Sequence, residues 1–491
     1  MTSTYPIPDQ DAAKALGAAL RRIGYSETAV HELLGEDAYS IERDAAPVEA
    51  RRLPATPLGT ATRLFFLQLP VSTEGANRAL GGRAVDALRS TGLAEVDGDV
   101  RPHSRILAIG DVLLASDGYS READDPADYV ATYTPTSRLC DSLTPRPRVA
   151  RALDVGTGPG IHALLAAQHA GHVIATDVNE RALAYTALNA ALNELTNVEC
   201  RRGSLFEPVA GERFDLITCN APYVVSPERR WAYRDSGFKA DQLSEQVVAA
   251  AAAHLNEGGF ATLLVSWLAH DEDEPNERAL EWAKASGCDS WIISTIEADP
   301  LSHAADWNSH LAGDPVAFER AVDEWTTYLR ELGVRWVSEG AILLHCRTGP
   351  VGEPRVDSLD EDELEEAGDQ ICRAFAARAR LAELSSDEEL LEAPLALASA
   401  VRLEEELEPD DDGPVVGDAR IRLAEGTKSS VEVEDDVLDV LGELGGDAPL
   451  GQAVDVAADR LDLSAAERAE LRRDAVTVGR ELLELGALRF T

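Results

Sequence analysis

Cysteine is scarce and scattered in this sequence, whose 491 residues hold six cysteines with no C-x-x-C pair. This spacing argues against zinc ligation and against a disulfide framework, so we expect no metal site and reduced thiols, as in a cytoplasm. Apolar runs of about 18 residues, which a membrane-spanning helix needs, are absent. The opening residues MTSTYPIPDQDAAK also lack the basic and apolar stretches of a secretory signal. We therefore expect a cytoplasmic location and no membrane partner.

Positive charge, and lysine in particular, is also in short supply. Only four of the 45 cationic residues are lysines, and 88 Asp and Glu residues give a formal net charge of −43. The acidic excess is greatest in residues 351–491, which hold 38 acidic and 14 basic residues. Binding of nucleic-acid phosphates normally relies on a cationic surface, which only a local arginine cluster would provide here. The composition thus favours a protein or small-molecule partner.

The length and the 45% hydrophobic content predict a multi-domain chain, with about three domains as the prior. Residues 1–125 are expected to form an N-terminal accessory α+β domain. It would have helices over 10–24 and 76–92 and a hairpin turn at Asp97-Gly98. Helices followed by a small hairpin suggest a winged-helix-like arrangement, and a generic accessory domain without a nucleic-acid role is the favoured alternative.

The C-terminal part falls into two stretches. Residues 351–430 are predicted to be an acidic helical or linker region, in which 404–418 (EEELEPDDDGPVVGD) forms solvated helix faces or linker. Residues 431–491 have apolar residues at helical spacing and end in a short strand, LRF. This predicts a small helical domain, which a second winged-helix-like arrangement would fit.

Residues 126–350 show apolar strand-like runs alternating with helical stretches, the pattern of a doubly wound α/β sheet. Residues 334–346 are read as a final β-hairpin. Between the last strands, residues 297–333 carry aromatic residues at helical spacing and predict a helical insertion that either caps the site or packs on the sheet. The predicted strands are 150–155, 172–177, 197–202, 214–219, 259–267 and 290–296.

A glycine-rich loop, D-V-G-T-G-P-G, lies directly after the first of these strands and before a helix. Glycines let the backbone turn sharply and approach a ligand, and the helix N-terminus offers free N–H groups. The G-x-G-x-G spacing differs from the dinucleotide fingerprint G-x-G-x-x-G, so NAD-dependent oxidoreduction is disfavoured. We expect the loop to bind a nucleotide-type cofactor through Asp154, Gly156, Thr157, Gly158 and Gly160.

Two further features follow neighbouring strands. Asp177 ends the second strand, where a carboxylate accepts hydrogen bonds from ribose hydroxyls. Asn220-Ala221-Pro222-Tyr223 follows the strand FDLITC and so should lie beside the glycine loop. The Asn220 side-chain oxygen and the Pro222 carbonyl can each accept one N–H bond of a planar –NH2 group. This would orient its nitrogen lone pair, while Tyr223 stacks on the planar target.

The stretch from Asp154 to Pro227 resembles a class I S-adenosylmethionine-dependent methyltransferase of the N-P-P-[YF] amino-methylating type. Among these, N-A-P-Y-V-V-S-P is most similar to the release-factor glutamine methyltransferases. The resemblance implies a Rossmann-like fold, S-adenosyl-L-methionine as cofactor, catalytic roles for Asn220, Pro222 and Tyr223, and cofactor contacts from Ser204, Leu205 and Asn220. The sequence departs from the family pattern at Ala221, in place of proline, and at Ser204, in place of the aspartate that binds the adenine amino group.

This resemblance predicts methyl transfer to a planar amine nitrogen, first of all a glutamine amide in a translation factor. Two alternatives remain open: a base amine of rRNA or tRNA, and a non-catalytic regulatory protein that only binds the cofactor. In either enzymatic case the partner is a protein or RNA of the translation machinery. Arg229 and Arg230 follow the catalytic motif, on a loop expected to face the substrate.

Overall fold

The computed structural model describes residues 6–119, 125–220, 222–228, 238–410 and 413–491. Ala221 and the arginines at 229 and 230 lie outside these residues. The chain divides into two compact units. The first comprises residues 1–140, 147–282 and 296–341, and the second comprises residues 141–146, 283–295 and 342–491.

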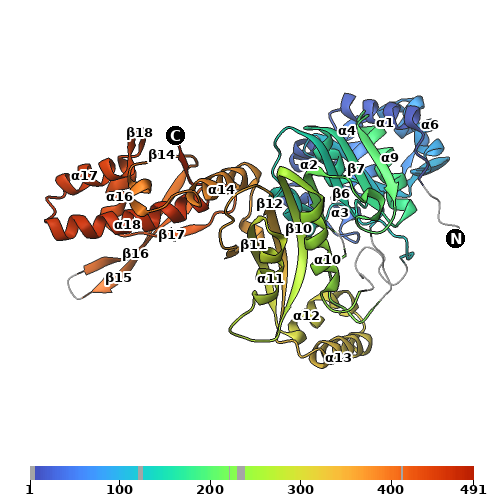
Figure 1. Ribbon diagram of the computed structural model, residues 1–491. Helices are drawn as coiled ribbons and strands as arrows, with labels where there is room; N and C mark the ends of the chain where they lie inside the picture. The colour runs from blue at the N-terminus through green and yellow to red at the C-terminus, as the bar shows by residue number, and fades with distance from the viewer. Residues whose placement is uncertain (1–5, 120–124, 221, 229–237, 411–412) are drawn as a thin grey trace. The chain divides into compact units, whose positions relative to one another are not determined.

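An eight-stranded sheet runs in the order β13-β11-β12-β10-β9-β6-β7-β8. Figure 1 labels β6, β7, β10, β11 and β12 of this sheet. The strands from β10 through β9, β6 and β7 to β8 are all parallel to their neighbours. This confirms the predicted α/β fold with a central parallel sheet. The strands are β6 Val149–Val155, β7 Ala170–Asp177, β8 Val198–Arg202, β9 Phe214–Cys219, β10 Leu255–Ala269, β11 Asp289–Ala298, β12 Trp336–His345 and β13 Arg355–Ser358.

The strand order reverses at β6, which has β7 on one side and β9 on the other. Val155, near the end of β6, is in register with Thr176 of β7 and with Cys219 of β9. The loops after these three strands therefore leave the same edge of the sheet at neighbouring positions, which is where ligands bind in such sheets. The helices of this part are α7 Pro135–Ser142, α8 Ile161–Ala167, α9 Glu180–Leu192, α10 Gln242–His254, α11 Glu277–Ser286, α12 Pro300–Trp307 and α13 Pro315–Glu331.

The sheet departs from the predicted pattern in two strands. Strand β13 lies in residues 351–430, which were predicted to be a helical or linker region. Residues 334–346 were expected to form a hairpin, but β12 runs as one strand through Ser338, Glu339 and Gly340. These residues are typical of a turn, yet Ser338 and Glu339 are 0% and 3% exposed. The indole N–H of Trp307 donates to Glu339 Oε1 at 2.8 Å, which provides this buried carboxylate with a partner inside the fold.

The N-terminal part of the first unit combines helices with two small sheets. The turn at Gly98 has φ +71° and joins β2 to β3, as predicted. The predicted helix over 76–92 is instead two helices, because Gly81 adopts φ +88° and breaks it. The elements are α1 Gln10–Arg22, α2 Glu27–Leu34, α3 Ala46–Glu49, α4 Pro57–Ala61, β1 Val71–Ser72, α5 Thr73–Leu80, α6 Gly82–Ser90, β2 Ala94–Asp97, β3 Asp99–Pro102, β4 Ser104–Ile109 and β5 Val112–Asp117.

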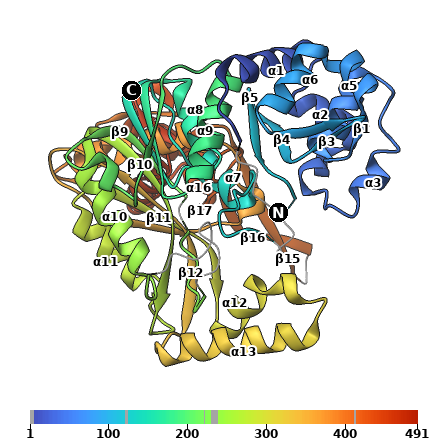
Figure 2. The same cartoon turned by 90° about the vertical axis from the view of Figure 1, so that its right-hand side faces the viewer.

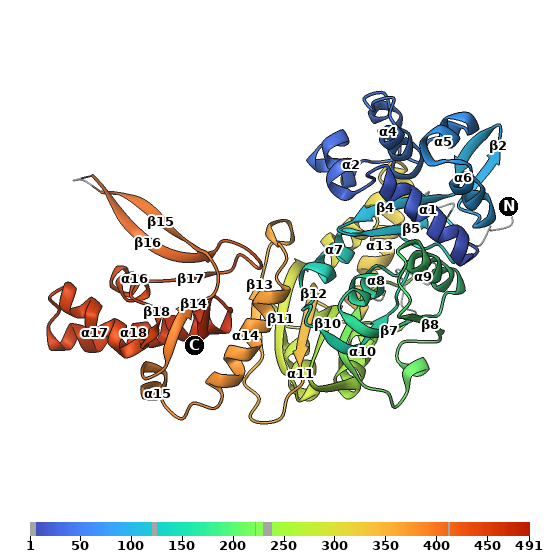
Figure 3. The ribbon, with the colours of Figure 1, turned by 90° about the horizontal axis from the view of Figure 1, so that it is seen from above.

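Helix α9 joins this N-terminal part to the parallel sheet (Figure 3). Helix α1 approaches it so closely at Gly17 that a Cβ there would lie 2.1 Å from the Leu192 carbonyl oxygen. On the other side, the Asn189 and Asn193 side chains each donate to and accept from the backbone of β5, with distances of 2.7–2.8 Å. Two amide side chains thus pair with the strand edge as a neighbouring strand would. Asn189 Nδ2 also donates to the Pro159 carbonyl in the glycine loop at 2.8 Å.

Replacing Asn189 with leucine should strongly destabilise the first unit. Asn189 is 0% exposed, and the substitution leaves the Ala115 N–H and carbonyl and the Pro159 carbonyl without this partner. Each buried polar group that loses its hydrogen bond costs about 1–3 kcal/mol, so we expect a loss of about 3 kcal/mol or more. Thermal unfolding of the full chain checks this, and a loss below about 1 kcal/mol would contradict the bridging role of Asn189.

The second unit has a mixed architecture. Residues 401–410 and 413–423 form the antiparallel strands β15 and β16, where helix or linker was predicted from 404 to 418. The run of glutamates obscured the strand pattern, but Leu403 stands opposite Ile421, and Glu404 lies 3.5 Å from Arg422. Opposite charges from the partner strand thus offset the acidic run. The elements are α14 Gly368–Leu381, α15 Asp387–Leu391, β14 Pro394–Leu397, β15 Val401–Asp410, β16 Gly413–Leu423, β17 Ser430–Glu432, α16 Asp435–Gly442, β18 Gly445–Pro449, α17 Leu450–Arg460, α18 Ala465–Glu484 and β19 Leu488–Phe490.

The helices over 435–484 and the final strand β19 match the helical spacing and the LRF strand expected for this region. The winged-helix-like arrangement of the two terminal regions stays a prediction, as do the domain boundaries. Among the helices of the described residues, each is too short or too polar to cross a bilayer.

Candidate functional site

The glycine loop takes the backbone conformations that only glycine adopts without strain. Gly156, Gly158 and Gly160 have φ values of +67°, +54° and +96°. Gly160 also caps helix α8, and a Cβ at this position would lie 2.9 Å from Thr186 Cγ2. The Thr157 N–H donates to the Thr176 carbonyl at 2.9 Å and holds the loop against β7. The loop is therefore pre-formed at the edge where β6 ends.

Asp154 supports this loop from inside the fold. It is 1% exposed, and its carboxylate accepts hydrogen bonds from Thr157 Oγ1 at 2.6 Å, Ala163 N at 3.1 Å and Thr218 Oγ1 at 2.9 Å. These donors come from the loop, from α8 and from β9. Asp154 was predicted to bind the cofactor. Its contacts show that it holds the loop in place between two strands.

Burial raises the pKa of Asp154 to about 6, against the hydrogen bonds of Thr157 and Thr218, which lower it. In the folded chain the Asp154 carboxyl therefore stays protonated up to a higher pH than in the unfolded chain, where an Asp has a pKa of ~3.9. Stability from this group is present below about pH 4 and is lost as the pH rises to about 6. As the pH rises over this interval, we therefore expect the melting temperature of the wild type to fall relative to that of Asp154→Asn. A difference that is constant with pH would contradict the assignment.

Asp177 lies at the carboxyl end of β7, one strand over from the loop. Its Oδ2 accepts the Gly158 N–H at 3.0 Å and its Oδ1 accepts the Asn179 N–H at 2.8 Å. Burial raises the pKa of this carboxyl, and the two backbone donors lower it. The side chain is only partly buried, so the carboxylate can still accept further hydrogen bonds from a ligand above the loop.

Ser204 and Leu205 follow β8, the next strand. The Gly203 N–H donates to the Asp177 carbonyl at 3.1 Å, which ties this turn to the end of β7. Leu205 adopts φ +48°, an uncommon conformation for a residue with a side chain, and its carbonyl accepts from Thr176 Oγ1 at 3.3 Å. The turn therefore presents Ser204, which is partly exposed, at the same edge as Asp177.

The predicted catalytic residues follow β9, on the other side of β6. Asn220 directly follows Cys219, which is in register with Val155, so Asn220 stands beside the start of the glycine loop. Asn220 and Pro222 are partly exposed, whereas Tyr223 is 8% exposed. The Tyr223 carbonyl accepts a hydrogen bond from Ser266 Oγ of β10 at 2.5 Å. Strand ends from β6, β7, β8 and β9 thus bring all the predicted site residues to one edge.

Sequence reasoning missed the residues that hold this site in place. Thr218 and Ser266 each contact a site residue from a neighbouring strand, and His303 contacts the Val225 carbonyl from helix α12. These are contacts between residues distant in sequence, and a Thr or Ser within an apolar strand was the only signal for the first two.

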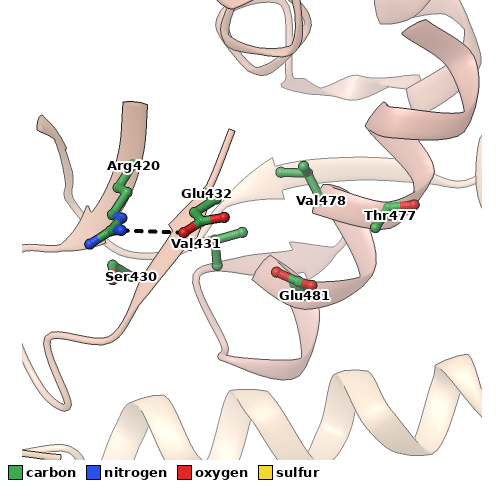
Figure 4. A pocket seen from close by; sticks show the side chains of 7 residues that line it. All are labelled: Arg420, Ser430, Val431, Glu432, Thr477, Val478 and Glu481. Atoms are coloured by element: carbon green, nitrogen blue, oxygen red, sulfur yellow. Dashed lines mark hydrogen bonds and ion pairs between the residues drawn. The ribbon is translucent and has the colours of Figure 1, made fainter. Parts of the chain in front are cut away.

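Two further points concern possible metal ligands and a hollow in the second unit. In the part of the chain that the structure describes, no group of three His, Cys, Asp or Glu side chains could hold a metal ion. A hollow of the second unit lies between β16, β17 and α18, where Arg420 pairs with Glu432 at 3.3 Å (Figure 4). Its lining includes none of the predicted site residues.

Comparisons with protein families match two segments of this chain. Residues 22–105 match a domain of unknown function, DUF7059. Residues 134–272 match the Methyltransferase small domain and include every predicted site residue. The resemblance of this segment to class I methyltransferases is therefore confirmed.

Two curated proteins are similar to part of the chain. A release factor glutamine methyltransferase of Xylella fastidiosa is 36% identical over 129 residues, which are 24% of this chain and 47% of that protein. A ribosomal protein uL3 glutamine methyltransferase of Xanthomonas campestris is 33% identical over 124 residues, 23% of this chain and 40% of that protein. This chain spans less than half the length of each.

Among solved structures, a methyltransferase from Pyrococcus furiosus is 19% identical, with a TM-score of 0.29. The match covers 48% of this chain and 90% of that protein.

Proposed function

We propose that this chain, which carries a class I methyltransferase domain over residues 134–272, transfers a methyl group from S-adenosylmethionine to a glutamine side-chain amide in a protein of the translation machinery. One observation carries the proposal. Asn220, Pro222 and Tyr223 stand at the end of β9, beside the end of β6 from which the glycine loop leaves. The proposed acceptors for an –NH2 group would then lie next to the proposed cofactor-binding loop.

The proposed cofactor cradle, made of this loop, Asp177 and Ser204, fits S-adenosylmethionine. Among the described residues, a Cβ on Gly158 would meet no atom within 4 Å apart from those of its chain neighbours, so this face of the loop has room for a ligand. The Asp177 carboxylate, at the end of the next strand, suits ribose hydroxyls, and the Ser204 hydroxyl, one strand further, suits the adenine amino group. When bound, S-adenosylmethionine supplies a methyl group on a positively charged sulfur.

The residues after β9 supply orientation rather than a strong base. An amide nitrogen is a poor nucleophile because its lone pair is delocalised into the carbonyl group. The Asn220 oxygen and the Pro222 carbonyl would each accept one amide N–H and fix the direction of the nitrogen lone pair. As positive charge develops on the nitrogen, these two acceptors stabilise it, and the Tyr223 ring excludes water from the planar target.

The choice of a protein acceptor rests on sequence and charge. The two similar curated proteins are named for glutamine methylation of a release factor and of a ribosomal protein. The net charge of −43 disfavours binding to the phosphates of RNA and favours a basic protein partner. A nucleobase amine is the competing acceptor that the test must distinguish.

The test uses the purified full chain, radiolabelled S-adenosylmethionine, and an extract of ribosomes and soluble proteins from cells that lack the gene. The labelled material is divided between protease and nuclease digestion. Label that becomes soluble with protease and survives nuclease is the expected result. Label released by nuclease alone would overturn the protein acceptor, and no transfer despite cofactor binding would indicate a regulatory protein.

A further inference from the structure

The segment after the catalytic motif is held by a helical insertion. Helices α12 and α13 lie together at one end of strand β10 (Figure 1, Figure 2). Each begins with an Asp-Pro pair, in which Asp299 or Asp314 caps the helix and proline occupies its first turn. The insertion therefore starts both of its helices by local signals, independently of the sheet.

Apolar contacts attach the catalytic segment to this insertion. Val224 is 6% exposed and packs in a cluster with Ala304 of α12 and with Val322 and Trp325 of α13. Val225, 1% exposed, belongs to a second cluster that contains Leu329 of α13. Two successive residues of the segment thus point into two separate clusters, each partly built by the insertion.

Polar contacts fix the same segment more specifically. His303 is 2% exposed, and its Nε2 lies 3.1 Å from the Val225 carbonyl oxygen, which accepts the hydrogen bond. Burial lowers the pKa of His303 to about 4, and its Nδ1 lies 3.5 Å from Glu339 Oε1. Because a carbonyl oxygen can only accept, Nε2 carries the N–H that points at Val225. The Trp325 indole N–H donates to Glu228 Oε1 at 3.3 Å.

The insertion also contacts Ala240, which follows residues 229–237 in the sequence. The Ala240 N–H donates to the hydroxyl oxygen of Tyr328 at 3.2 Å. Ala240 and Tyr328 both pack against the cluster that contains Val225. Helix α13 thus contacts the chain before and after residues 229–237.

We infer that the insertion Pro300–Glu331 positions the Tyr223–Glu228 segment for the methyl acceptor, and that His303 is a positioning residue in this insertion. The inference rests on the proposed function, since it assigns the segment to acceptor orientation. His303 touches the carbonyl of the second residue after Tyr223, whereas the cofactor cradle is built from the ends of β6, β7 and β8. Loss of His303 should therefore impair turnover of the acceptor and spare cofactor binding.

The test compares His303→Phe, which keeps a planar ring but removes the N–H donor, with His303→Gln, which keeps a donor. His270→Phe is the matched control, because His270 Nδ1 makes a similar contact of 3.0 Å to the Gly333 carbonyl, beyond the end of α13. Four quantities are measured on the full chain: affinity for S-adenosylmethionine, kcat and KM for a purified release factor, and amide hydrogen exchange of residues 222–228.

For His303→Phe we expect kcat to fall about tenfold or more and exchange of residues 222–228 to rise by a similar factor, while cofactor affinity stays within about twofold. His303→Gln should recover much of both losses, and His270→Phe should resemble the wild type. Unchanged exchange of residues 222–228 in His303→Phe would overturn the inference, as would an equal loss of cofactor affinity. If the wild type does not methylate the release factor, that protein is not the acceptor, and the exchange result still decides whether His303 holds this segment.

Discussion

Asn220→Ala is expected to lower kcat for methyl transfer by about 10²–10³-fold, the usual cost of removing one pre-organised hydrogen-bonding group from a reaction centre. In the proposed mechanism the Asn220 oxygen is one of two acceptors for the target –NH2 group, and the Pro222 carbonyl alone leaves the planar amide free to rotate about a single hydrogen bond. Affinity for S-adenosylmethionine should weaken far less, because the loop, Asp177 and Ser204 belong to other strand ends. Steady-state kinetics with the labelled acceptor, together with a cofactor titration, separates the two effects.

Asn256→Ala is the matched control for this substitution. Its Nδ2 donates to Asp215 Oδ1 at 2.8 Å, at the start of β10 rather than at the carboxyl edge of the sheet. The control should retain the wild-type kcat. If Asn220→Ala retains it as well, the orientation mechanism fails.

Asp177→Ala should weaken binding of S-adenosylmethionine by about 10–100-fold, with a much smaller change in kcat at saturating cofactor. The carboxylate orders the loop by accepting the Gly158 N–H, and in the proposed mode of cofactor binding it also accepts ribose hydroxyls. Hydrogen bonds to a charged group contribute about 1.5–3 kcal/mol each, and about 1.4 kcal/mol corresponds to a factor of ten in affinity. Isothermal titration calorimetry of the purified chain measures the change.

Asp215→Asn provides the comparison. Asp215 Oδ2 accepts the backbone N–H groups of Ala150 and Arg151 at 3.0 and 2.9 Å, so it too is a carboxylate held by two amides. It lies at the beginning of the strands, however, away from the glycine loop. Asp215→Asn should lower stability without changing cofactor affinity. Equal affinity losses in both variants would show that Asp177 acts only through folding.

The parallel sheet and its loops were predictable because their signals are local. Apolar runs, a glycine loop and an Asn-x-Pro-Tyr turn each occupy a few consecutive residues, and strand order then gathers them at one edge. The insertion was predicted to be helical. Whether it caps the site or packs on the sheet was left open, because the contact between His303 and Val225 joins residues that are 78 apart in sequence.

Two errors of prediction, at residues 338–340 and in β15, also arise from contacts between residues that are distant in sequence. Ser338-Glu339-Gly340 has the composition of a turn but lies in a strand, where Glu339 is buried and accepts a hydrogen bond from Trp307. The acidic residues of β15 resemble a solvated linker until the arginines of β16 stand opposite them. In both places, partners from distant parts of the chain override the local preference.

Mass spectrometry of the labelled acceptor tests the central claim most directly. The acceptor is isolated from the extract after reaction with the wild-type chain, digested, and its methylated residue is sequenced. We expect one added methyl group on a glutamine side-chain amide of a translation protein. This methyl group should be absent when Asn220→Ala replaces the wild type. A methyl group on a nucleobase, on a carboxylate or on a lysine would contradict it.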